Sequence, residues 1–325
     1  MFCRSTTSQR LKSSSCELVE KVLLADNGIQ KRHFANPNLE GIFEQDAQQL
    51  NEIFESQAPS LASATLNDSL SKSATLATDL DALFVCTCTG YLCPGISSFV
   101  AEKLGMRSNV FLQDIVGLGC GALIPTLRAA HNFLHSGSGK QIAVVAVEIC
   151  SAAFYIDDDP GVLISLCIFG DGCSASIWTR DSKPSIGEIS HFDTLHLPKK
   201  RNLLRFENRD GKLRNRLHFT IPAISSQAVE TLYQRNHTSS IEAMVSHGGG
   251  RDVLHAIEKR LPQFDLQSSR NVLSAYGNMS SPSVFFGLED YLNAHPNSGQ
   301  LWLTSFGAGF ACHGCSFRPT SQSID

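Results

Sequence analysis

The sequence predicts an α/β protein built from two similar halves, and three observations predict it. Apolar strands alternate with amphipathic helices from about residue 81 to 180, and the same alternation returns from about 243 to 317. A repeated order of this kind is typical of sheets covered by helices. The chain has 325 residues, of which 42% are hydrophobic, so it is long enough to bury a large core. We expect one half over residues 1–180 and the other over residues 181–325.

The first half contains the more regular set of predicted elements. Residues 1–80 are polar and mixed, and we expect helices joined by loops there. Residues 81–90, DALFVCTCTG, form a continuous apolar run that ends on glycine, as in a strand buried on both faces. The other expected elements are a helix at 95–106, an all-round apolar helix opened by Cys120, a strand at 141–150, and a helix, Gly-Asp-Gly turn and strand at 162–180.

The second half begins with a polar stretch that carries basic residues. Residues 180–216 resemble a solvated surface connection, although their charge could also steer an anionic substrate or carrier. After this stretch the alternation returns. The expected elements are a strand at 243–250, a helix at 251–261, a strand-like segment at 271–278, a helix at 279–292 and closing strands at 301–317.

Composition excludes several classes of function. Basic residues number 27 and acidic residues 31, for a formal net charge of −4, so we expect no binding to nucleic acid or to an anionic membrane. No apolar run approaches the roughly 18 residues of a spanning helix. The start, MFCRSTTSQRLKSSSC, lacks the apolar core of a secretory signal. We expect a cytoplasmic protein.

The sequence contains eleven cysteines, which we expect to be free thiols in a reducing compartment. Cys86, Cys88 and Cys93 do not have the spacing of a common zinc site. The pair Cys312 and Cys315 has no second pair to complete four ligands. The sequence therefore predicts buried small side chains at these positions and no metal site.

Cys120 lies between Gly119 and Gly121 at the head of an apolar helix. The positive end of a helix dipole lowers the pKa of a thiol and favours the nucleophilic thiolate. The neighbouring glycines would let a substrate approach closely. The alternative is that small residues only allow a tight turn here.

Two further residues lie beside glycine at junctions between predicted elements. His247 ends an apolar strand before three glycines, and Asn278 follows Gly277 ahead of a helix. His247 could instead be a capping or surface residue, and Asn278 could be a plain helix N-cap. Together with Cys120 they form a set suited to covalent acyl transfer, in which a thiolate attacks a thioester and the imidazole and amide bind an enolate oxygen.

Six segments of the sequence together resemble one known family. They are CTCTGYLCPG, GLGCGALIPTLR, VEICSAAF, IFGDGCSAS, SHGGG and YGNMSS. In this order and spacing they resemble type III polyketide synthases, the chalcone/stilbene synthase-like branch of the thiolase superfamily, from about Asn27 to Phe317. The resemblance implies a five-layered αβαβα thiolase-like fold, an acyltransferase activity and a homodimer.

The resemblance also implies the chemistry of the site. Cys120 looks like the nucleophile that accepts the acyl group, and His247 and Asn278 look like the pair that decarboxylates a malonyl extender and holds its enolate. The implied substrates are acyl-CoA and malonyl-CoA, the implied product is a polyketide such as a pyrone, resorcinol or chalcone, and no cofactor is implied.

Three further residues match substrate-binding positions of the family. Phe154 matches a phenylalanine that gates the junction of a pantetheine tunnel with the initiation cavity. Gly307 and Gly309 match a backbone loop at the border of the cyclisation cavity. An apolar, gated cavity would exclude water and let the carbanion condense before it is protonated.

The sequence departs from the family pattern in three places. Residues 1–26 carry no clear apolar strand, so we expect the first half to be truncated or to lack an element. Val19, Val22 and Asp26 occupy positions where plant members place basic residues for the phosphates of coenzyme A. Gly248 replaces a proline after His247, which loosens that loop.

These departures leave two alternatives open. One is a ketoacyl synthase that performs a single condensation and receives its substrate from an acyl carrier protein, for which the basic stretch KKRNLLRFENR is the motive. The other is a thiolase-like protein that binds an acyl ligand or partner without turnover. A Cys-His-Asn peptidase is set aside, because the surrounding segments do not match the papain-like pattern.

Overall fold

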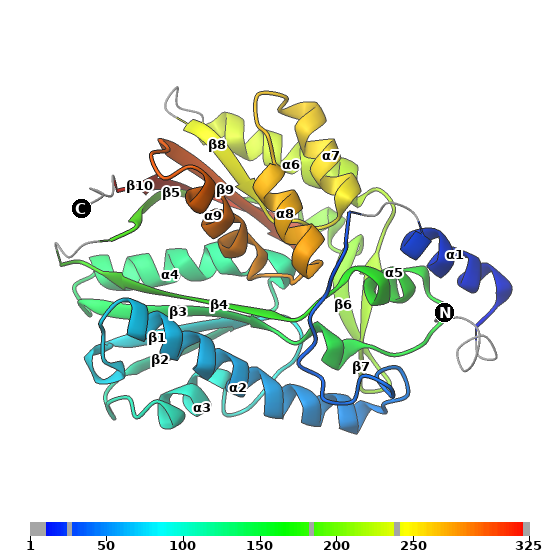
Figure 1. Cartoon of the computed structure of the whole chain (residues 1–325), viewed down its shortest axis with the longest axis horizontal. Helices are drawn as coiled ribbons and strands as arrows, with labels where there is room; N and C mark the ends of the chain where they lie inside the picture. The colour runs from blue at the N-terminus through cyan, green and yellow to red at the C-terminus, as the bar shows by residue number, and fades with distance from the viewer. Residues whose placement is uncertain (1–10, 25–27, 182–184, 237–240, 321–325) are drawn as a thin grey trace.

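A computed structural model describes residues 11–24, 28–181, 185–236 and 241–320 (Figure 1). The helices are α1 (Ser13–Leu24), α2 (Ala47–Lys72), α3 (Ile96–Lys103), α4 (Leu123–His135), α5 (Pro160–Ile168), α6 (Ile221–Asn236), α7 (Arg251–Arg260), α8 (Gln267–Tyr276) and α9 (Ser283–Ala294). The strands are β1 (Ala82–Thr87), β2 (Phe111–Val116), β3 (Gln141–Glu148), β4 (Gly172–Thr179), β5 (Gly187–His196), β6 (Leu204–Arg209), β7 (Lys212–Leu217), β8 (Ile241–Ser246), β9 (Gln300–Gly307) and β10 (Ala311–Pro319). Short 3-10 turns lie at Ala77–Asp79, Gly119–Gly121, Cys150–Ala153 and Pro198–Lys200.

The two four-stranded sheets share part of their pattern of strand direction and differ at β5, which is antiparallel to β10. The first has the order β2-β1-β3-β4, in which β1 is parallel to β2 and β3 and β4 is antiparallel to β3. The second has the order β5-β10-β9-β8, in which β8 is parallel to β9 and β10 is antiparallel to β9. A parallel pair followed by an antiparallel strand therefore occurs in both sheets, as two similar halves require.

The helices and sheets alternate in five layers (Figure 1). Side chains of α2 and α3 pack on the outer face of the first sheet, and those of α4 and α9 fill the space between the two sheets. Side chains of α6 and α7 cover the outer face of the second sheet. Every residue of β1 and of β3 is buried, as expected for apolar strands covered on both faces. The predicted five-layered αβαβα fold is confirmed.

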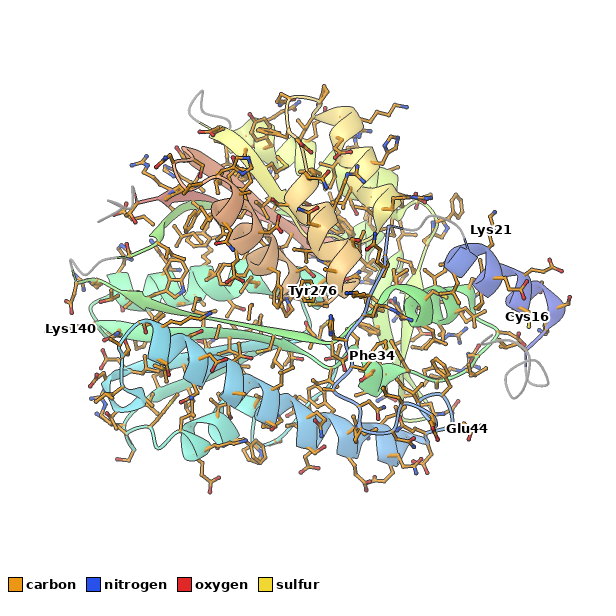
Figure 2. The ribbon with its side chains drawn as sticks, in the orientation of Figure 1. Cys16, Lys21, Phe34, Glu44, Lys140 and Tyr276 are labelled. Carbon is orange, nitrogen blue, oxygen red and sulfur yellow. The ribbon has the colours of Figure 1, made fainter. Side chains whose placement is uncertain are left out.

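A segment after α1 connects the two halves across their front (Figure 2). The backbone N–H groups of Gln30 and Lys31 donate to the carbonyl of Ser274, and His33 accepts from the N–H of Asp171. The Arg32 guanidinium donates to two carbonyl groups in and just after α5. Residues 28–33 thus connect α8 by hydrogen bonds to the loop between α5 and β4, close to Asn278.

Residues 180–216 are more ordered than the predicted surface connection. β5 is one of the two edge strands of the second sheet and pairs with β10, and β6 and β7 form a separate hairpin. Arg214 of the hairpin pairs with Asp159, the N-cap of α5, and β7 packs against that helix. The prediction of a solvated connection is wrong for this hairpin, because Arg214 and Arg216 pair with the N-cap residue of a buried helix, although Arg209 is solvent-exposed.

Two other elements differ from the prediction. Residues 271–278 were expected to be strand-like, but residues 267–276 form α8, whose apolar side chains repeat with a helical period. β2 was not expected, and it is an edge strand that exposes much of its length. No strand is present between residues 11 and 24, where α1 lies instead; residues 1–10 and Asp26 fall outside the described chain. No helix within the described ranges is long and apolar enough to cross a membrane.

Candidate active site

Cys120 lies in the 3-10 turn that precedes α4, and closely packed backbone holds this turn in place. A Cβ atom on Gly307 would lie 2.4 Å from the carbonyl oxygen of Leu118 and 3.0 Å from the backbone nitrogen of Cys120. Only glycine fits at position 307. Gly119, whose φ of +61° favours glycine, packs in the same way against the backbone of Ala308. The predicted glycine loop therefore borders the Cys120 turn directly at Gly307, while Gly309 lies farther along, beside His196.

The Cys120 thiol is only partly exposed and has three polar neighbours: Cys88, His247 and Ser280. A hydrogen bond from Cys88 lowers the pKa of Cys120 well below its ordinary value. Burial opposes this effect, and His247 adds to it through a hydrogen bond and its charge. A cysteine with a depressed pKa in a partly accessible position has the properties of a nucleophile.

His247 is buried at the end of β8 and is fixed from two sides. Its backbone N–H donates to the carbonyl of Thr304 at 2.8 Å, and its ring packs edge-on against Phe306 with centroids 5.2 Å apart. The side chain is 1% exposed, and Nδ1 has no hydrogen-bond partner in the described chain. The alternative that His247 is a surface residue is wrong.

Asn278 connects the histidine loop to the loop after α5. Its Nδ2 donates to the carbonyl of Gly249 at 3.3 Å, and its backbone N–H donates to the carbonyl of Ile168 at 2.8 Å. Its Oδ1 accepts the N–H of Ser280 at 2.8 Å. The N-cap of α9 is Pro282, so the alternative that Asn278 is a plain helix cap is wrong. The structure brings Cys120, His247 and Asn278 to one place between the two halves.

Glu148 is a buried charge at this place that the sequence analysis did not single out. Its carboxylate is 0% exposed and lies at the end of β3. Burial raises its pKa, while its hydrogen-bond donors oppose the rise. Five donors surround it: the Thr87 hydroxyl at 3.2 Å, the Cys88 N–H at 2.9 Å, and the hydroxyl groups of Thr89, Ser280 and Ser281 at 2.9, 3.1 and 2.6 Å. Glu148 thereby joins the ends of β1 and β3 to the Asn278 loop. Glu148 could have been identified in the sequence because it is the one acidic residue in the apolar run QIAVVAVEIC.

Two family models together match most of the chain. The first, described as FAE1/Type III polyketide synthase-like protein, matches residues 2–193, and the second, the C-terminal domain of chalcone and stilbene synthases, matches residues 204–314. The chain belongs to the type III polyketide synthase family. The predicted acyltransferase that builds polyketides is thereby confirmed at the level of the family.

Curated relatives of this polyketide synthase include two bacterial enzymes. A phloroglucinol synthase of Pseudomonas fluorescens is 25% identical over 307 residues, which cover 89% of this chain and 86% of the relative. A 1,3,6,8-tetrahydroxynaphthalene synthase of Streptomyces coelicolor is 25% identical over 275 residues, which cover 82% and 73%.

Solved structures share the fold over nearly the whole chain. The C-terminal type III polyketide synthase domain of Steely1 from Dictyostelium has a TM-score of 0.86 at 22% identity, covering 95% of this chain and 91% of that one. CsyB in complex with CoA-SH has a TM-score of 0.84 at 19% identity, covering 95% and 92%.

The predicted gate residue of the synthase, Phe154, lies between a surface pocket and a small inner cavity. Phe154 lines the inner cavity together with Cys150 and Phe169. Its ring stacks on Phe43, which lines the outer pocket, with centroids 6.3 Å apart. Phe169 forms a backbone bridge to Asn278 and is a second aromatic candidate for substrate contact that the sequence analysis missed. Its place directly before the Gly-Asp-Gly turn was the available signal.

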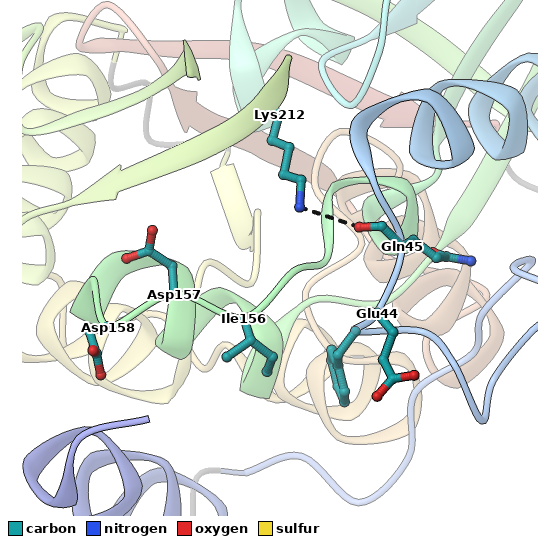
Figure 3. A pocket seen from close by; sticks show the side chains of 7 residues that line it. Glu44, Gln45, Ile156, Asp157, Asp158 and Lys212 are labelled. Carbon is teal, nitrogen blue, oxygen red and sulfur yellow. Dashed lines mark hydrogen bonds between the residues drawn. The ribbon is translucent and has the colours of Figure 1, made fainter. Parts of the chain in front are cut away.

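The outer pocket has a volume of about 370 Å³ and is shown in Figure 3. Its wall carries the carboxylates of Glu44, Asp157 and Asp158, and Lys212 reaches across it to the carbonyl of Gln45 at 3.3 Å. Val19, on the nearby α1, packs against a core cluster that includes Phe154. No group of three or more His, Cys, Asp or Glu side chains in the described ranges could hold a metal ion.

Proposed function

We propose that this polyketide synthase extends an acyl group bound to Cys120 with malonyl units, and that His247 and Asn278 generate and hold the attacking enolate. The observation that carries the proposal is that Cys120, His247 and Asn278 lie at one place, with Asn278 bonded to the loop of His247. Hydrogen bonds from Cys88 and His247 lower the pKa of the Cys120 thiol there. The thiolate is the form of cysteine that attacks a thioester.

In the loading step, the Cys120 thiolate attacks the carbonyl carbon of an acyl-CoA. The bond from that carbon to the coenzyme A sulfur breaks, and the departing thiolate takes a proton from the His247 imidazolium. The acyl group then remains on Cys120 as a thioester. The tight contact between Gly307 and the Cys120 backbone keeps the attacking sulfur in place.

In the extension step, a malonyl-CoA loses carbon dioxide, and the electron pair of the broken bond forms an enolate. Asn278 uses one Nδ2 hydrogen for Gly249 and has a second hydrogen for the enolate oxygen. His247 also donates to that oxygen, after it has taken up from solvent a proton that replaces the one lost in the loading step. The enolate carbon attacks the Cys120 thioester, a carbon–carbon bond forms, and the Cys120 thiolate leaves.

The proposal is tested by incubating the protein with an acyl-CoA and isotopically labelled malonyl-CoA and measuring condensed products by mass spectrometry. Cys120→Ala should lower product formation by about a thousandfold or more, because the covalent intermediate cannot form. Cys315→Ala removes a different buried thiol in the core between the sheets and should keep the activity. Equal product from the wild type and Cys120→Ala would refute the role of Cys120.

The intact mass of the protein separates an enzyme from a thiolase-like binding protein. Exposure to acyl-CoA should add the acyl mass to the wild type and not to Cys120→Ala. His247→Gln should still acquire the adduct, more slowly, but should not extend it, because enolate formation is lost. A wild-type protein that gains no mass would favour the binding protein.

We propose coenzyme A thioesters as starter and extender, with no cofactor, since every group in these steps is a side chain of the protein. The relative CsyB was solved with CoA-SH. An acyl carrier protein is the less favoured donor. In the basic stretch, residues 199–209, Arg205 pairs with Glu207 at 2.8 Å, and Lys199, Lys200, Arg201 and Arg209 are its exposed cations.

We propose a homodimer that forms along β2. This strand pairs only with β1 in the described chain, and it exposes 45% of Phe111 and 46% of Val116. An exposed edge strand with apolar side chains is a template for pairing with another chain, and closed two-fold symmetry is the commonest arrangement of like subunits. The cytoplasmic location stays a prediction.

A further inference from the structure

Arg32 is a half-buried basic residue of the segment that connects the two halves, and it has no part in the proposed steps. Its Nη1 donates to the carbonyl of Leu166 at 2.6 Å and to the carbonyl of Phe169 at 3.1 Å. Hydrogen bonds from a charged donor are stronger than those between neutral groups. The guanidinium carbon also lies 5.1 Å from the centre of the ring of Phe34, which is labelled in Figure 2. Arg32 is therefore fixed at three places near the end of α5.

The Leu166 carbonyl is available to Arg32 because of the way α5 ends. In a continuing helix, the N–H of Gly170 would donate to the carbonyl of Leu166, four residues earlier. The N–H of Gly170 instead donates to the carbonyl of Asn278 at 3.1 Å, and the N–H of Asn278 donates to the carbonyl of Ile168 at 2.8 Å. The Asn278 backbone thus pairs with the end of α5, and Arg32 supplies the donor that Gly170 does not give to Leu166.

The methylene stem of Arg32 packs against the residue before Asn278. A Cβ atom on Gly277 would lie 2.8 Å from Cγ of Arg32 and 2.8 Å from the carbonyl oxygen of Ile168. The φ of Gly277 is +72°, a conformation that favours glycine. Gly277 is therefore enclosed between the Arg32 stem and the end of α5, so the backbone of Asn278 has little freedom to shift while Arg32 is in place.

The direction of the Asn278 side chain depends on this backbone. Its Nδ2 donates to the carbonyl of Gly249 at 3.3 Å, and its Oδ1 accepts the N–H of Ser280 at 2.8 Å. One Nδ2 hydrogen is left for the enolate. A displacement of about 1 Å in a reacting geometry can cost about a hundredfold in rate. The proposed loading of Cys120 uses no group of Asn278, so a displaced amide should slow the extension step and not the loading step.

We propose that Arg32 is a positioning residue for Asn278. By binding the carbonyls of Leu166 and Phe169, Arg32 holds the end of α5 against the backbone of Asn278 and so places the amide that binds the enolate. Arg32 itself does not touch the substrate. The inference rests on the proposed function in taking Asn278 as a residue that binds the enolate.

The test compares two rates in the wild type, Arg32→Ala, Arg32→Lys, Lys31→Ala and Asn278→Ala. The first is the release of carbon dioxide from carboxyl-labelled malonyl-CoA without a starter, in which the enolate takes a proton from solvent and becomes acetyl-CoA. The second is the loading of Cys120 by an acyl-CoA, followed by intact mass. Arg32→Ala should lower the first rate by about tenfold or more, in kcat rather than in KM, and should change the second by less than about threefold.

Two variants and one local measurement support this comparison. Arg32→Lys keeps the charge on a shorter side chain without the planar fork, so it should show the same selective loss in smaller measure, and it decides the test if thermal unfolding shows that Arg32→Ala is not folded. Lys31→Ala removes an exposed cation of the same segment, keeps the backbone bond to Ser274, and should match the wild type. Amide hydrogen exchange at Gly170 and Asn278 should be faster in Arg32→Ala and unchanged in Lys31→Ala.

The failure of this inference differs from the failure of the proposed function. Wild-type release of carbon dioxide by a folded Arg32→Ala protein, with release lost in Asn278→Ala, would overturn the role of Arg32 alone. An equal loss of both rates in Arg32→Ala would also overturn it, because Arg32 would then support the fold in general. Wild-type release by Asn278→Ala would show that the proposed function assigns Asn278 wrongly, and the inference about Arg32 would fall with it.

Discussion

At the residue scale, the site depends on a few side chains whose neighbours decide their chemistry. Cys120 is one of eleven cysteines, yet Cys86, Cys173 and Cys315 have raised pKa values because burial dominates around them. Cys120 differs because donors reach it from Cys88 and His247. The neighbouring glycines identified Cys120 in the sequence. Its hydrogen-bond donors lie far away in the sequence, so only the folded structure identifies them.

The carboxylate of Glu148 offers a prediction at this scale. Glu148→Ala leaves the Cys88 N–H and four hydroxyl groups without their acceptor in a buried site. We expect a loss of about 3 kcal/mol or more in the free energy of unfolding, because each unsatisfied buried donor costs about 1–3 kcal/mol and the hydroxyls can partly re-pair. Urea unfolding measures the loss.

Two matched variants separate this effect from a general loss of side chain. Ser281→Ala removes one donor to Glu148 and should cost about 1 kcal/mol. Glu102→Ala removes an exposed glutamate of α3 and should change stability by less than about 0.5 kcal/mol. If Glu148→Ala unfolds at the same urea concentration as Glu102→Ala, the carboxylate does not hold the strand ends together.

At the scale of elements, local pattern predicted most strands and helices that carry the site. The elements predicted from continuous apolar runs lie where these runs occur in the sequence; they are β1, β3, α4 and β8. α8 was misassigned because the run NVLSAY is short, and a short apolar run fits either type of element. β2 was missed because its apolar residues are mixed with polar ones.

The β6–β7 hairpin was not predicted for a different reason. Its basic residues appear solvated in the sequence, but Arg214 and its partner Asp159 are only 12% and 14% exposed in their side chains. The partner lies 55 residues away, so no local pattern reports it. The hairpin supplies Phe206, Leu213 and Asn215 to the wall of the inner cavity.

The ion pair that fastens this hairpin gives a prediction at the element scale. Arg214→Ala leaves the Asp159 carboxylate partly buried with only Arg216, at 3.3 Å, as its charged partner. We expect a loss of about 2–3 kcal/mol in stability, at the lower end of what breaking a buried pair costs, because Arg216 compensates in part. The substitution should also increase the rate of amide hydrogen exchange in residues 204–217 more than it does in β3.

Arg209→Ala is the control for this prediction. Arg209 lies on the same hairpin, and its ion pair with Asp210 is solvent-exposed, with side-chain exposures of 64% and 93%. A surface pair of this kind contributes about 0–1 kcal/mol, so the variant should exchange and unfold like the wild type. Equal exchange in both variants would mean that packing on α5, and not the Arg214 pair, holds the hairpin.

At the scale of the whole molecule, the site forms where the two halves meet. Cys120 and Glu148 belong to the first half, and His247, Asn278 and Ser280 belong to the second. Neither half alone contains both the proposed nucleophile and the residues proposed to bind the enolate. The order of the motifs in the sequence predicted that these residues are divided between the two halves. The contacts between their side chains depend on how the layers pack.

The proposed homodimer is tested at this same scale by charge at the β2 edge. Phe111→Arg and Val116→Arg place a cation on a strand that would face its symmetry mate, where like charges repel and the arginine must lose water. We expect the mass in solution, measured by light scattering, to fall from about twice the 35.4 kDa of one chain to that of one chain. Phe111 also contacts Phe84 and Phe133, so thermal unfolding must establish that this variant is folded.

Val116→Arg does not have that complication, because Val116 ends β2 and contributes no ring contact. Leu76→Arg is the control, since Leu76 is 66% exposed and precedes the 3-10 turn before β1 rather than lying on the β2 edge. A protein that stays dimeric in both β2 variants must use another surface. If only Leu76→Arg becomes monomeric, the interface lies beside that 3-10 turn. An added positive charge would then have been tolerated along β2, the strand whose backbone hydrogen-bonding groups are open at the sheet edge.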